Sequence, residues 1–403
     1  MAARKARKPS DIPVSDELSK VLEAMKKQFG EKTVMYGNEA TQPWRIPTGI
    51  FTFDYATLGG IPHNRIAMFH GPKHSGKSST ALRCVAGAQK SLPDQKAVFV
   101  DIEGTFDDVW AEKVGVDTSE MILVSPDYGE QAVDATVGLV HAKETSLIVI
   151  DSLAALLPIK EQEASAEDSL VGQQSRMITS MLRKVSAAQI AERKRDHFVT
   201  ILLINQQRSK IGGWSPTGDP LSLPGGKALG HFTSLEARFK NKENIAKDGD
   251  GFETLSVNEH AFTIEKNKCN AGMRSGEFRM MRREDEQTGL LEGDIDDATT
   301  MLTFAKRIGW YTGAGRGQSL DFADVAEKFG SIDDATVWLY ENRDEYWKLR
   351  CHLIAYAAEK CGMKPEFVDY LRGEAAYEAG LEAEVGLAEV AVTKRIGRSS
   401  RAA

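Results

Sequence analysis

The apolar residues of this chain form short continuous runs that alternate with longer segments of helical spacing. Apolar runs bounded by polar or turn-forming residues are typical of buried strands. Such runs lie at residues 65–70, 97–101, 121–124, 147–151 and 199–205. Continuous apolar strands separated by helices indicate a parallel sheet that is covered on both faces, so we predict an α/β fold with a mostly parallel sheet.

A helix is predicted ahead of these strands. Ser15 can cap it, and Gly30 can end it. Its apolar positions follow helical spacing and are Leu18, Val21, Leu22, Met25 and Phe29. One short helix cannot bury such a stripe by itself, so we expect it to pack on its own core or on a neighbouring subunit.

The strand at residues 65–70 leads into a motif with a specific chemistry. Residues 71–78 fit G-x-x-x-x-G-K-[ST], the phosphate-binding P-loop, and a helix-compatible segment follows. Backbone N–H groups of such a loop surround phosphates, Lys77 reaches the β- and γ-phosphates, and the Ser78 hydroxyl binds Mg²⁺. A chance glycine turn is the alternative, and the flanking segments favour a nucleoside-triphosphate site. The residues expected to contact the nucleotide are Gly71, Pro72, Lys73, His74, Ser75, Gly76, Lys77, Ser78 and Ser79.

Polar residues at the carboxyl ends of the other strands are candidates for the same site, because ligands bind there in open parallel sheets. They are Glu103, Asp151, Asn205 and Gln206. Asp151 follows four apolar residues, as a Walker B aspartate does, and is expected to hold Mg²⁺ opposite Ser78. Its alternative is a helix N-cap. Glu103 is the candidate base for the attacking water, and its alternative is a surface carboxylate in an acidic loop.

Two segments are predicted to be loops, residues 161–170 and 207–226. The first is acidic and rich in small residues, whereas the second contains Arg208, Lys210 and Trp214 among glycines and prolines. A loop of about twenty residues inside a compact domain is usually functional or disordered. Basic residues with one aromatic residue suit a nucleic-acid contact, and a mobile surface loop explains the same composition.

Composition and charge set limits on these interpretations. The chain has 403 residues, of which 41% are hydrophobic and 27% charged, enough for two or three domains. Its formal net charge of −7 provides no global basic field, so DNA binding has to come from local loops and grooves. The four cysteines lack ligand-type spacing, which indicates reduced thiols. With no apolar stretch of spanning length and no signal-peptide core, we expect a cytoplasmic protein without a membrane partner.

From about Leu18 to Gly362, the motifs together resemble one family, the RecA-type DNA recombinases. Residues 23–30 resemble the family's N-terminal helix, which docks on the adjacent subunit. Residues 100–103 resemble its catalytic-glutamate strand, and residues 150–158 resemble its Walker B strand. The resemblance implies a RecA-like P-loop ATPase core with an N-terminal helix and a small α/β C-terminal domain.

Further roles follow from the resemblance alone. Asp107 and Trp110 fall where the family contacts adenine, with Trp110 in place of the usual tyrosine. A first DNA-binding loop is implied at residues 159–172, with Arg176 and Arg183 on the helix behind it.

The most specific match is the segment Ile-Asn-Gln-Gln-Arg-Ser-Lys-Ile-Gly at residues 204–212. It resembles the family's sensor for the γ-phosphate, with Gln206 in that role, and leads into a second DNA-binding loop. Trp214 lies near the place of that loop's aromatic wedge. The residues implied to contact DNA here are Arg208, Lys210, Trp214, Gly225 and Gly226.

Residues 265–268 resemble the segment whose two lysines, here Lys266 and Lys268, reach the ATP of the neighbouring subunit. Positions i and i+2 of a strand share a face, so both ammonium groups can point at one phosphate group. A solvated basic edge strand is the alternative. The chain departs from the family nearby, because residues 230–231 are Gly-His where the family usually has Lys-Phe. This departure bears on how the ATP state crosses the subunit interface.

The resemblance implies an ATP-dependent homologous recombinase that forms a helical filament on single-stranded DNA and promotes pairing and strand exchange. ATP and Mg²⁺ are the expected cofactors. The expected partners are single- and double-stranded DNA, further copies of the chain, and loader, mediator or single-strand-binding proteins. The implied catalytic residues are Lys77, Glu103, Gln206, Lys266 and Lys268.

Four regions are predicted along the chain. They are a basic tail and oligomerisation helix at 1–45, the ATPase core at 46–289, a small C-terminal domain at 290–362, and a helical or disordered tail at 363–403.

Other functions on the same core remain as alternatives. A ring-forming helicase motor would need a helicase-type linker and an arginine finger from its neighbour. A non-catalytic mediator fits poorly with intact Lys77, Ser78, Asp151 and Glu103. An ATP-dependent kinase or transporter subunit would need substrate or coupling motifs, and we find none in the sequence.

Overall fold

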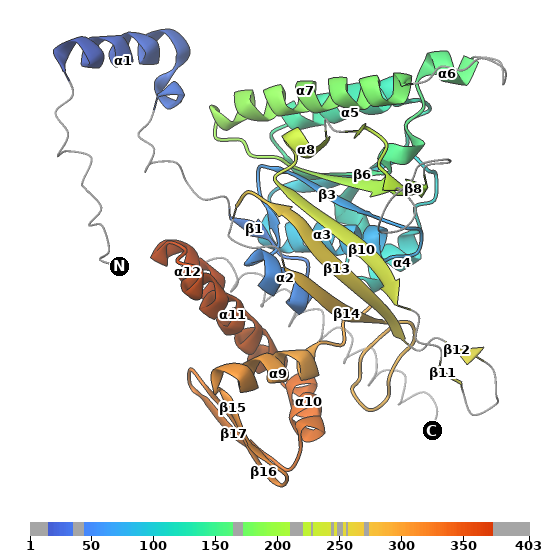
Figure 1. Ribbon diagram of the computed structural model, residues 1–403, viewed down its shortest axis with the longest axis vertical. Coiled ribbons are helices and arrows are strands. Elements are labelled where there is room, and N and C mark those ends of the chain that lie inside the picture. The colour runs from blue at the N-terminus through green and yellow to red at the C-terminus, as the bar shows by residue number, and fades with distance from the viewer. Residues whose placement is uncertain are drawn as a thin grey trace.

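A computed structural model describes residues 15–34, 44–163, 172–209, 221–226, 229–242, 246–247, 253–254, 257–269 and 274–373. Within these residues the largest sheet has eight strands in the order β14-β13-β10-β3-β7-β6-β4-β5 (Figure 1). Its strands are β3 (Ile66–Gly71), β4 (Lys96–Asp101), β5 (Met121–Val124), β6 (Thr145–Asp151), β7 (Thr200–Gln206), β10 (Leu235–Lys242), β13 (Val257–Asn267) and β14 (Ser275–Met281). The strands from β10 to β5 pair in parallel, and β13 runs antiparallel to both of its neighbours.

The two faces of this sheet are covered by different helices. On one face α2 (Phe51–Thr57) and α3 (Lys77–Ser91) pack over side chains such as Phe69. On the other face α5 (Gly129–His141) and α7 (Gln173–Arg193) pack over side chains such as Met68. Burial on both faces makes β3, β4, β6 and β7 apolar almost throughout, which is why the pattern of continuous runs predicts them. The predicted α/β fold with a mostly parallel sheet is confirmed.

Smaller elements surround the sheet. The short helices are α4 (Asp108–Lys113), α6 (Ile159–Glu163) and α8 (Leu229–Phe232), with 3₁₀ turns at Glu31–Thr33, Thr118–Glu120 and Leu153–Ala155. The short strands are β1 (Arg45–Ile46), β2 (Ile61–Pro62), β8 (Arg208–Ser209), β9 (Leu221–Ser222), β11 (Ala246–Lys247) and β12 (Glu253–Thr254).

Two segments that we predict to be loops contain regular structure. Helix α6 covers the start of the first, and the pairing of β8 with β9 closes the second. The polar composition from which a loop was inferred does not prevent either element, because an exposed turn of helix and a two-residue ladder need little apolar burial.

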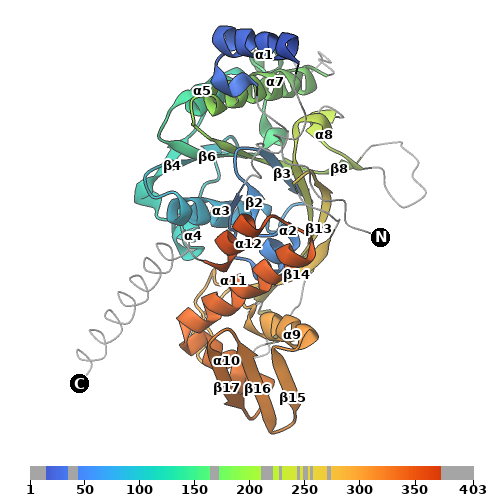
Figure 2. The same cartoon turned by 90° about the vertical axis from the view of Figure 1, so that its left-hand side faces the viewer.

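The C-terminal part folds around a second hydrophobic cluster, which also includes Phe51 and Leu58 from the region of α2. In Figures 1 and 2 the strands β15–β17 lie at the lower end of the molecule, whereas α12 lies higher, near α2. Its elements are α9 (Ala298–Ile308), β15 (Tyr311–Ala314), β16 (Gly317–Phe322), β17 (Val325–Phe329), α10 (Ile332–Glu341), α11 (Arg343–Lys360) and α12 (Pro365–Arg372). Phe367, Val368 and Leu371 of α12 are buried in this cluster. The packed chain therefore continues past residue 362, where we expected the tail to begin, and residues 374–403 lie outside the described residues.

A buried ionic network joins the C-terminal part to the core. Arg350 of α11 has no exposed surface and forms ion pairs with Asp54 of α2 and, at 3.6 Å, with Asp297. Asp297 also accepts a hydrogen bond of 3.0 Å from the backbone N–H of Phe51. Because these charges are buried, each depends on its partners for compensation, and removing one partner of such a pair is strongly destabilising.

Helix α1 (Asp16–Phe29) begins and ends as predicted. The Ser15 hydroxyl accepts a hydrogen bond from the N–H of Leu18, and Gly30 ends the helix at φ +98°. Within the described part of the chain its apolar stripe is largely exposed, with exposed fractions of 49% for Leu18, 50% for Val21 and 51% for Phe29. In Figure 2, α1 lies at the end of the molecule opposite β15–β17. Among the described helices, none combines the length and the apolar character that a membrane span requires.

Candidate active site

Four neighbouring strands bring the predicted site residues to one edge of the sheet. In the order β3, β7, β6 and β4, their carboxyl ends lead to the P-loop, Gln206, Asp151 and Glu103. Residues that are more than one hundred positions apart in the sequence therefore meet in space, as the parallel topology requires.

The P-loop takes a conformation that only glycine permits at two positions. Gly71 ends β3, and a Cβ atom there would lie 2.4 Å from the carbonyl oxygen of Phe239. Gly76 has φ +84° and precedes α3, and its Cβ would lie 3.0 Å from the His260 ring. The glycines let the loop turn directly into the helix, so the backbone N–H groups at the N-terminus of α3 face the loop.

Lys77, the first residue of α3, is folded into the loop. Its ammonium group donates a hydrogen bond of 2.5 Å to the carbonyl of Pro72 and one of 3.3 Å to the Ser75 hydroxyl. Burial lowers the pKa of Lys77, and the nearby carboxylates of Asp151 and Glu103 counteract this effect. The charge therefore lies where a P-loop holds phosphate.

Asp151 and Ser78 provide oxygen atoms suited to a hard cation. Burial raises the pKa of Asp151 to about 6, and a hydrogen bond from the Ser78 hydroxyl opposes this rise. Mg²⁺ prefers oxygen ligands and usually keeps several waters, binding through one or two carboxylates and substrate phosphates. One carboxylate and one hydroxyl beside a phosphate loop match that preference, so these residues fit Mg²⁺ bound together with a nucleotide.

Glu103 is held by two neighbours. Its Oε1 atom accepts a hydrogen bond of 2.7 Å from the Gln206 side-chain amide, and another from the Ser152 hydroxyl. The loop that carries Glu103 is shaped by Asp101, which accepts hydrogen bonds of 2.9 Å from the N–H groups of Gly104 and Phe106. The carboxylate is thus fixed at the edge of the site while remaining exposed to solvent.

Sequence reasoning missed the roles of Asp101 and Ser152. Asp101 is the last residue of β4, two positions before Glu103, and Ser152 directly follows Asp151 at the end of β6, so position at a strand end was the available signal. Neither residue type distinguishes a positioning contact from an ordinary turn, which is why the pattern alone did not select them.

Trp110 and Asp107 lie beside the start of α3. Asp107 caps α4 by accepting a hydrogen bond of 2.9 Å from the N–H of Trp110. The indole N–H of Trp110 donates a hydrogen bond of 3.1 Å to the Ser79 hydroxyl, and its ring packs on the hydrophobic core. The aromatic side chain predicted to stack on adenine is therefore fixed next to the P-loop helix.

Lys266 of β13 and Lys268, just after the end of β13, both contact the turn of α8. Lys266 donates hydrogen bonds to the carbonyl of Gly230 and, at 3.2 Å, to the Thr233 hydroxyl, and it forms an ion pair of 3.5 Å with Glu236. Lys268 donates a hydrogen bond of 3.2 Å to the carbonyl of His231. The residues that depart from the family pattern thus supply the carbonyls that hold the lysines. Burial lowers the pKa of Lys266, and Glu236 counteracts it.

The residues predicted to bind DNA are only partly described. Arg176 and Arg183 are exposed on α7, and neither forms an ion pair within the described part of the chain. Gly225 and Gly226 have φ of +93° and +59°, and the preceding Pro224 carbonyl accepts a hydrogen bond of 3.0 Å from the buried Asn205 amide. Arg208 lies on β8, but its side chain, like all of Lys210 and Trp214, lies outside the described residues.

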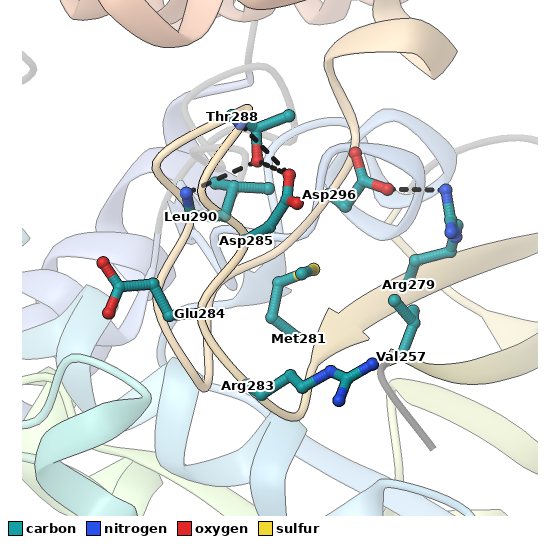
Figure 3. A pocket seen from close by; sticks show the side chains of 9 residues that line it. All are labelled: Val257, Arg279, Met281, Arg283, Glu284, Asp285, Thr288, Leu290 and Asp296. Carbon is teal, nitrogen blue, oxygen red and sulfur yellow. Dashed lines mark hydrogen bonds and ion pairs between the residues drawn. The ribbon is translucent and has the colours of Figure 1, made fainter. Parts of the chain in front are cut away.

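A pocket of about 390 Å³ lies away from this site, between β13, β14 and the loop that follows β14 (Figure 3). Four of its polar residues form two pairs with one another. Arg279 forms an ion pair of 2.6 Å with Asp296, and Asp285 accepts a hydrogen bond of 3.1 Å from the N–H of Thr288. The pocket contains none of the predicted site residues.

Comparison with known proteins agrees with this geometry. A family model described as the RecA N-terminal domain matches residues 16–285. The RecA protein of Bacillus velezensis is 34% identical over 353 residues, which are 85% of this chain and 95% of that protein. The RecA protein of Bacillus subtilis is 34% identical over 315 residues, covering 76% of this chain and 86% of the relative. The RecA protein of Nocardia farcinica is 36% identical over 302 residues, covering 74% and 82%. The chain therefore belongs to the RecA family.

Proposed function

We propose that the protein is an ATP-dependent DNA recombinase that forms a helical filament on single-stranded DNA and promotes pairing and strand exchange with homologous duplex DNA. The observation that carries this proposal is the 2.7 Å hydrogen bond between Gln206 and Glu103. It joins the carboxylate of the candidate ATPase site to the residue that precedes the second predicted DNA-binding loop. A change in the nucleotide can therefore change the loop that contacts DNA.

Each residue at the sheet edge has a distinct part in the proposed hydrolysis. Lys77 and the N-terminus of α3 bind the phosphates, and Ser78 and Asp151 hold the cation, which when bound neutralises charge on the phosphate oxygens. Glu103 orients a water molecule and accepts its proton. Ser152 and Gln206 fix the Glu103 carboxylate, because each donates a hydrogen bond to its Oε1 atom.

Assembly of subunits completes the proposed site. The exposed stripe of α1 offers an apolar surface to an adjacent copy, which is one of the two packing partners predicted from its sequence. Lys266 and Lys268 of the neighbour then approach the γ-phosphate and neutralise charge there, as an arginine finger does. A head-to-tail interface of this kind does not close on itself, so repetition gives a helix.

Electron microscopy of negatively stained protein tests the assembly directly. With a non-hydrolysable ATP analogue and single-stranded DNA, we expect helical filaments, and with ADP we expect few or none. Closed rings would support the helicase alternative. Particles that stay monomeric under both conditions, although they bind DNA, would contradict the recombinase proposal and favour a mediator.

A further inference from the structure

A polar network crosses four neighbouring strands on the side of the site toward β13. It runs from Gln207, directly after β7, through His70 on β3 to Glu265 on β13 and Arg238 on β10. Figure 1 shows β10 and β13 side by side next to β3. None of these four residues belongs to the P-loop or to the candidate catalytic residues, so the network needs an explanation of its own.

His70 is the buried centre of this network, with 3% of its side chain exposed. Its Nδ1 atom lies 3.2 Å from the amide nitrogen of Gln207, and its Nε2 atom lies 3.1 Å from Oε2 of Glu265. A neutral ring with its proton on Nε2 suits both contacts, because Nδ1 then accepts from the amide and Nε2–H faces the carboxylate. Burial lowers the pKa of His70, which favours this neutral form, although Glu265 and Glu236 oppose the shift and Arg238 reinforces it.

Glu265 sits at an irregularity in the ladder between β10 and β13. Ala237 pairs with Ile264, but Glu236 pairs with Lys266, so Glu265 is an extra residue on β13. Its carboxylate lies 2.8 Å from Arg238 Nε, while the next residue, Lys266, contacts Glu236. Residues 236 and 238 share one face of β10, so the consecutive residues 265 and 266 also lie on one face. A regular strand would send them to opposite faces, and a bulge re-aims a side chain in this way.

The other end of the network is connected to the sensor. Gln206 and Gln207 are consecutive at the end of β7, and their side chains contact Glu103 and His70 respectively. The backbone N–H of Gln207 also donates a hydrogen bond of 3.2 Å to the carbonyl of Gly71, the first residue of the P-loop. A shift of this strand end therefore moves one amide against the catalytic carboxylate and the other against the buried imidazole.

We propose that Gln207, His70 and Glu265 are positioning residues that hold the bulge of β13 in register with the γ-phosphate sensor and thereby set where Lys266 lies. The inference rests on the proposed function, because it assigns Lys266 its part in the neighbour's site. It explains why an extra residue and two ion-pair contacts are built next to that lysine. The network transmits the state of Gln206 to the subunit edge through side chains that lie outside the P-loop and are not among the residues predicted to contact DNA.

The test compares Gln207→Leu and Glu265→Gln, which keep side-chain size, with the parent and with Glu277→Gln as a control. Glu277 lies on β14, outside the network, and forms an ion pair with Lys242, the last residue of β10. Affinity for a fluorescent oligo-dT is measured with ADP and with a non-hydrolysable ATP analogue, together with the melting temperature and the affinity for the analogue. We expect each variant to reduce the ratio of the two DNA affinities by roughly 3- to 30-fold. The control should keep the parent ratio.

The double variant distinguishes a shared network from two independent contacts. If the residues act in series, Gln207→Leu/Glu265→Gln should lose no more of the ratio than the more severe single variant. DNA-stimulated ATP hydrolysis should fall in kcat with little change in KM for ATP, because the phosphate contacts remain.

Three results would overturn the inference. A parent protein with equal DNA affinity in both nucleotide states would refute the proposed function and this inference with it. If the parent binds DNA more tightly with the ATP analogue than with ADP, and the single variants keep the same ratio of affinities, the inference is refuted while the proposed function stands. If the variants bind DNA equally more weakly with ADP and with the ATP analogue, and also melt at a lower temperature, the network has only a packing role. Should Glu265→Gln fold poorly, the partly exposed Gln207→Leu decides between these outcomes.

Discussion

At the scale of single residues, the candidate site depends on how its carboxylates are supported. Glu103 is exposed and held by two hydrogen bonds, whereas Asp151 is largely buried beside Lys77. The two acids are therefore suited to different tasks. The exposed and oriented carboxylate can accept a proton from water, and the buried one can hold a cation.

Glu103→Gln should separate hydrolysis from binding. Because the amide cannot accept a proton, we expect DNA-stimulated ATP turnover to fall about a hundredfold or more. Binding of an ATP analogue and of DNA should persist, since the P-loop contacts are unchanged. Lys77→Ala should lose both nucleotide binding and filament activation. Turnover measured with single-stranded DNA decides the point, and undiminished turnover in Glu103→Gln would remove this residue from the catalytic role.

Asp151→Asn should make the nucleotide-free protein more stable at neutral pH. Burial raises the pKa of Asp151 from its ordinary 3.8 to about 6, so the native state prefers the protonated acid. The free energy of unfolding therefore falls as the pH rises from about 3.8 to about 6, and the full cost of the buried, ionised Asp151 is present at pH 7. We expect the variant to gain about 1–3 kcal/mol in urea unfolding at pH 7 and almost nothing near pH 4. The exposed Asp94→Asn is the control, and an equal gain at both pH values would contradict this account.

At the scale of elements, the sequence predicts the strands that are buried on both faces. β3, β4, β6 and β7 are continuous apolar runs, and they place the P-loop, Glu103, Asp151 and Gln206 at one edge. β10 and β13 mostly alternate buried with half-exposed residues and carry charges, so a search for continuous apolar runs does not find them. Only the end of β13, near Lys266, is predicted to be a strand, and this prediction follows from the family resemblance. The network of His70 with Glu265 was equally hidden, because it depends on strand order and on one extra residue in β13.

Helix α1 gives a prediction at this scale. Val21→Ser/Phe29→Ser should change the free energy of unfolding by less than about 0.5 kcal/mol per site, because both side chains are already exposed. Filament formation should be lost if the stripe is the surface that an adjacent copy covers. Lys20→Ser/Lys27→Ser, on the opposite side of the helix, is the matched control. Sedimentation with DNA and ATP analogue measures assembly, and filaments of normal length from the first variant would exclude the stripe from the interface.

At the scale of the whole molecule, one buried arginine joins two hydrophobic clusters. Arg350→Met removes the cation that faces Asp54 and Asp297 and should destabilise the protein by about 3–5 kcal/mol. Burial raises the pKa of both aspartates, so acid protonates them and should shrink the difference. Urea unfolding at pH 7 and pH 5 measures this. Adding Asp54→Asn and Asp297→Asn should recover part of the loss, and no recovery would indicate that packing rather than charge is responsible.

Mixed assemblies test whether Lys266 and Lys268 act across subunits. Lys266→Ala/Lys268→Ala should bind ATP but fail to activate its neighbour, and Lys77→Ala should fail to bind ATP. Together they should regain some DNA-stimulated hydrolysis, because one kind of mixed interface contains an intact P-loop and intact lysines. If the variants assemble together on DNA and every mixing ratio stays inactive, the lysines do not act in trans.

The contact between Lys266 and Glu236 bears on how easily a filament comes apart. In the proposed assembly the lysine gives up a carboxylate of its own chain before it meets a phosphate of the next. One anionic partner replaces another, so the lysine itself contributes to the subunit interface only the difference between two attractions, besides the apolar contact expected of α1. A small net contribution makes the filament sensitive to the nucleotide, because loss of the γ-phosphate returns Lys266 to Glu236 of its own chain. Because this exchange leaves the number of ion pairs unchanged, the contact of the lysine with the neighbouring subunit should depend less on salt concentration than the contacts with DNA do.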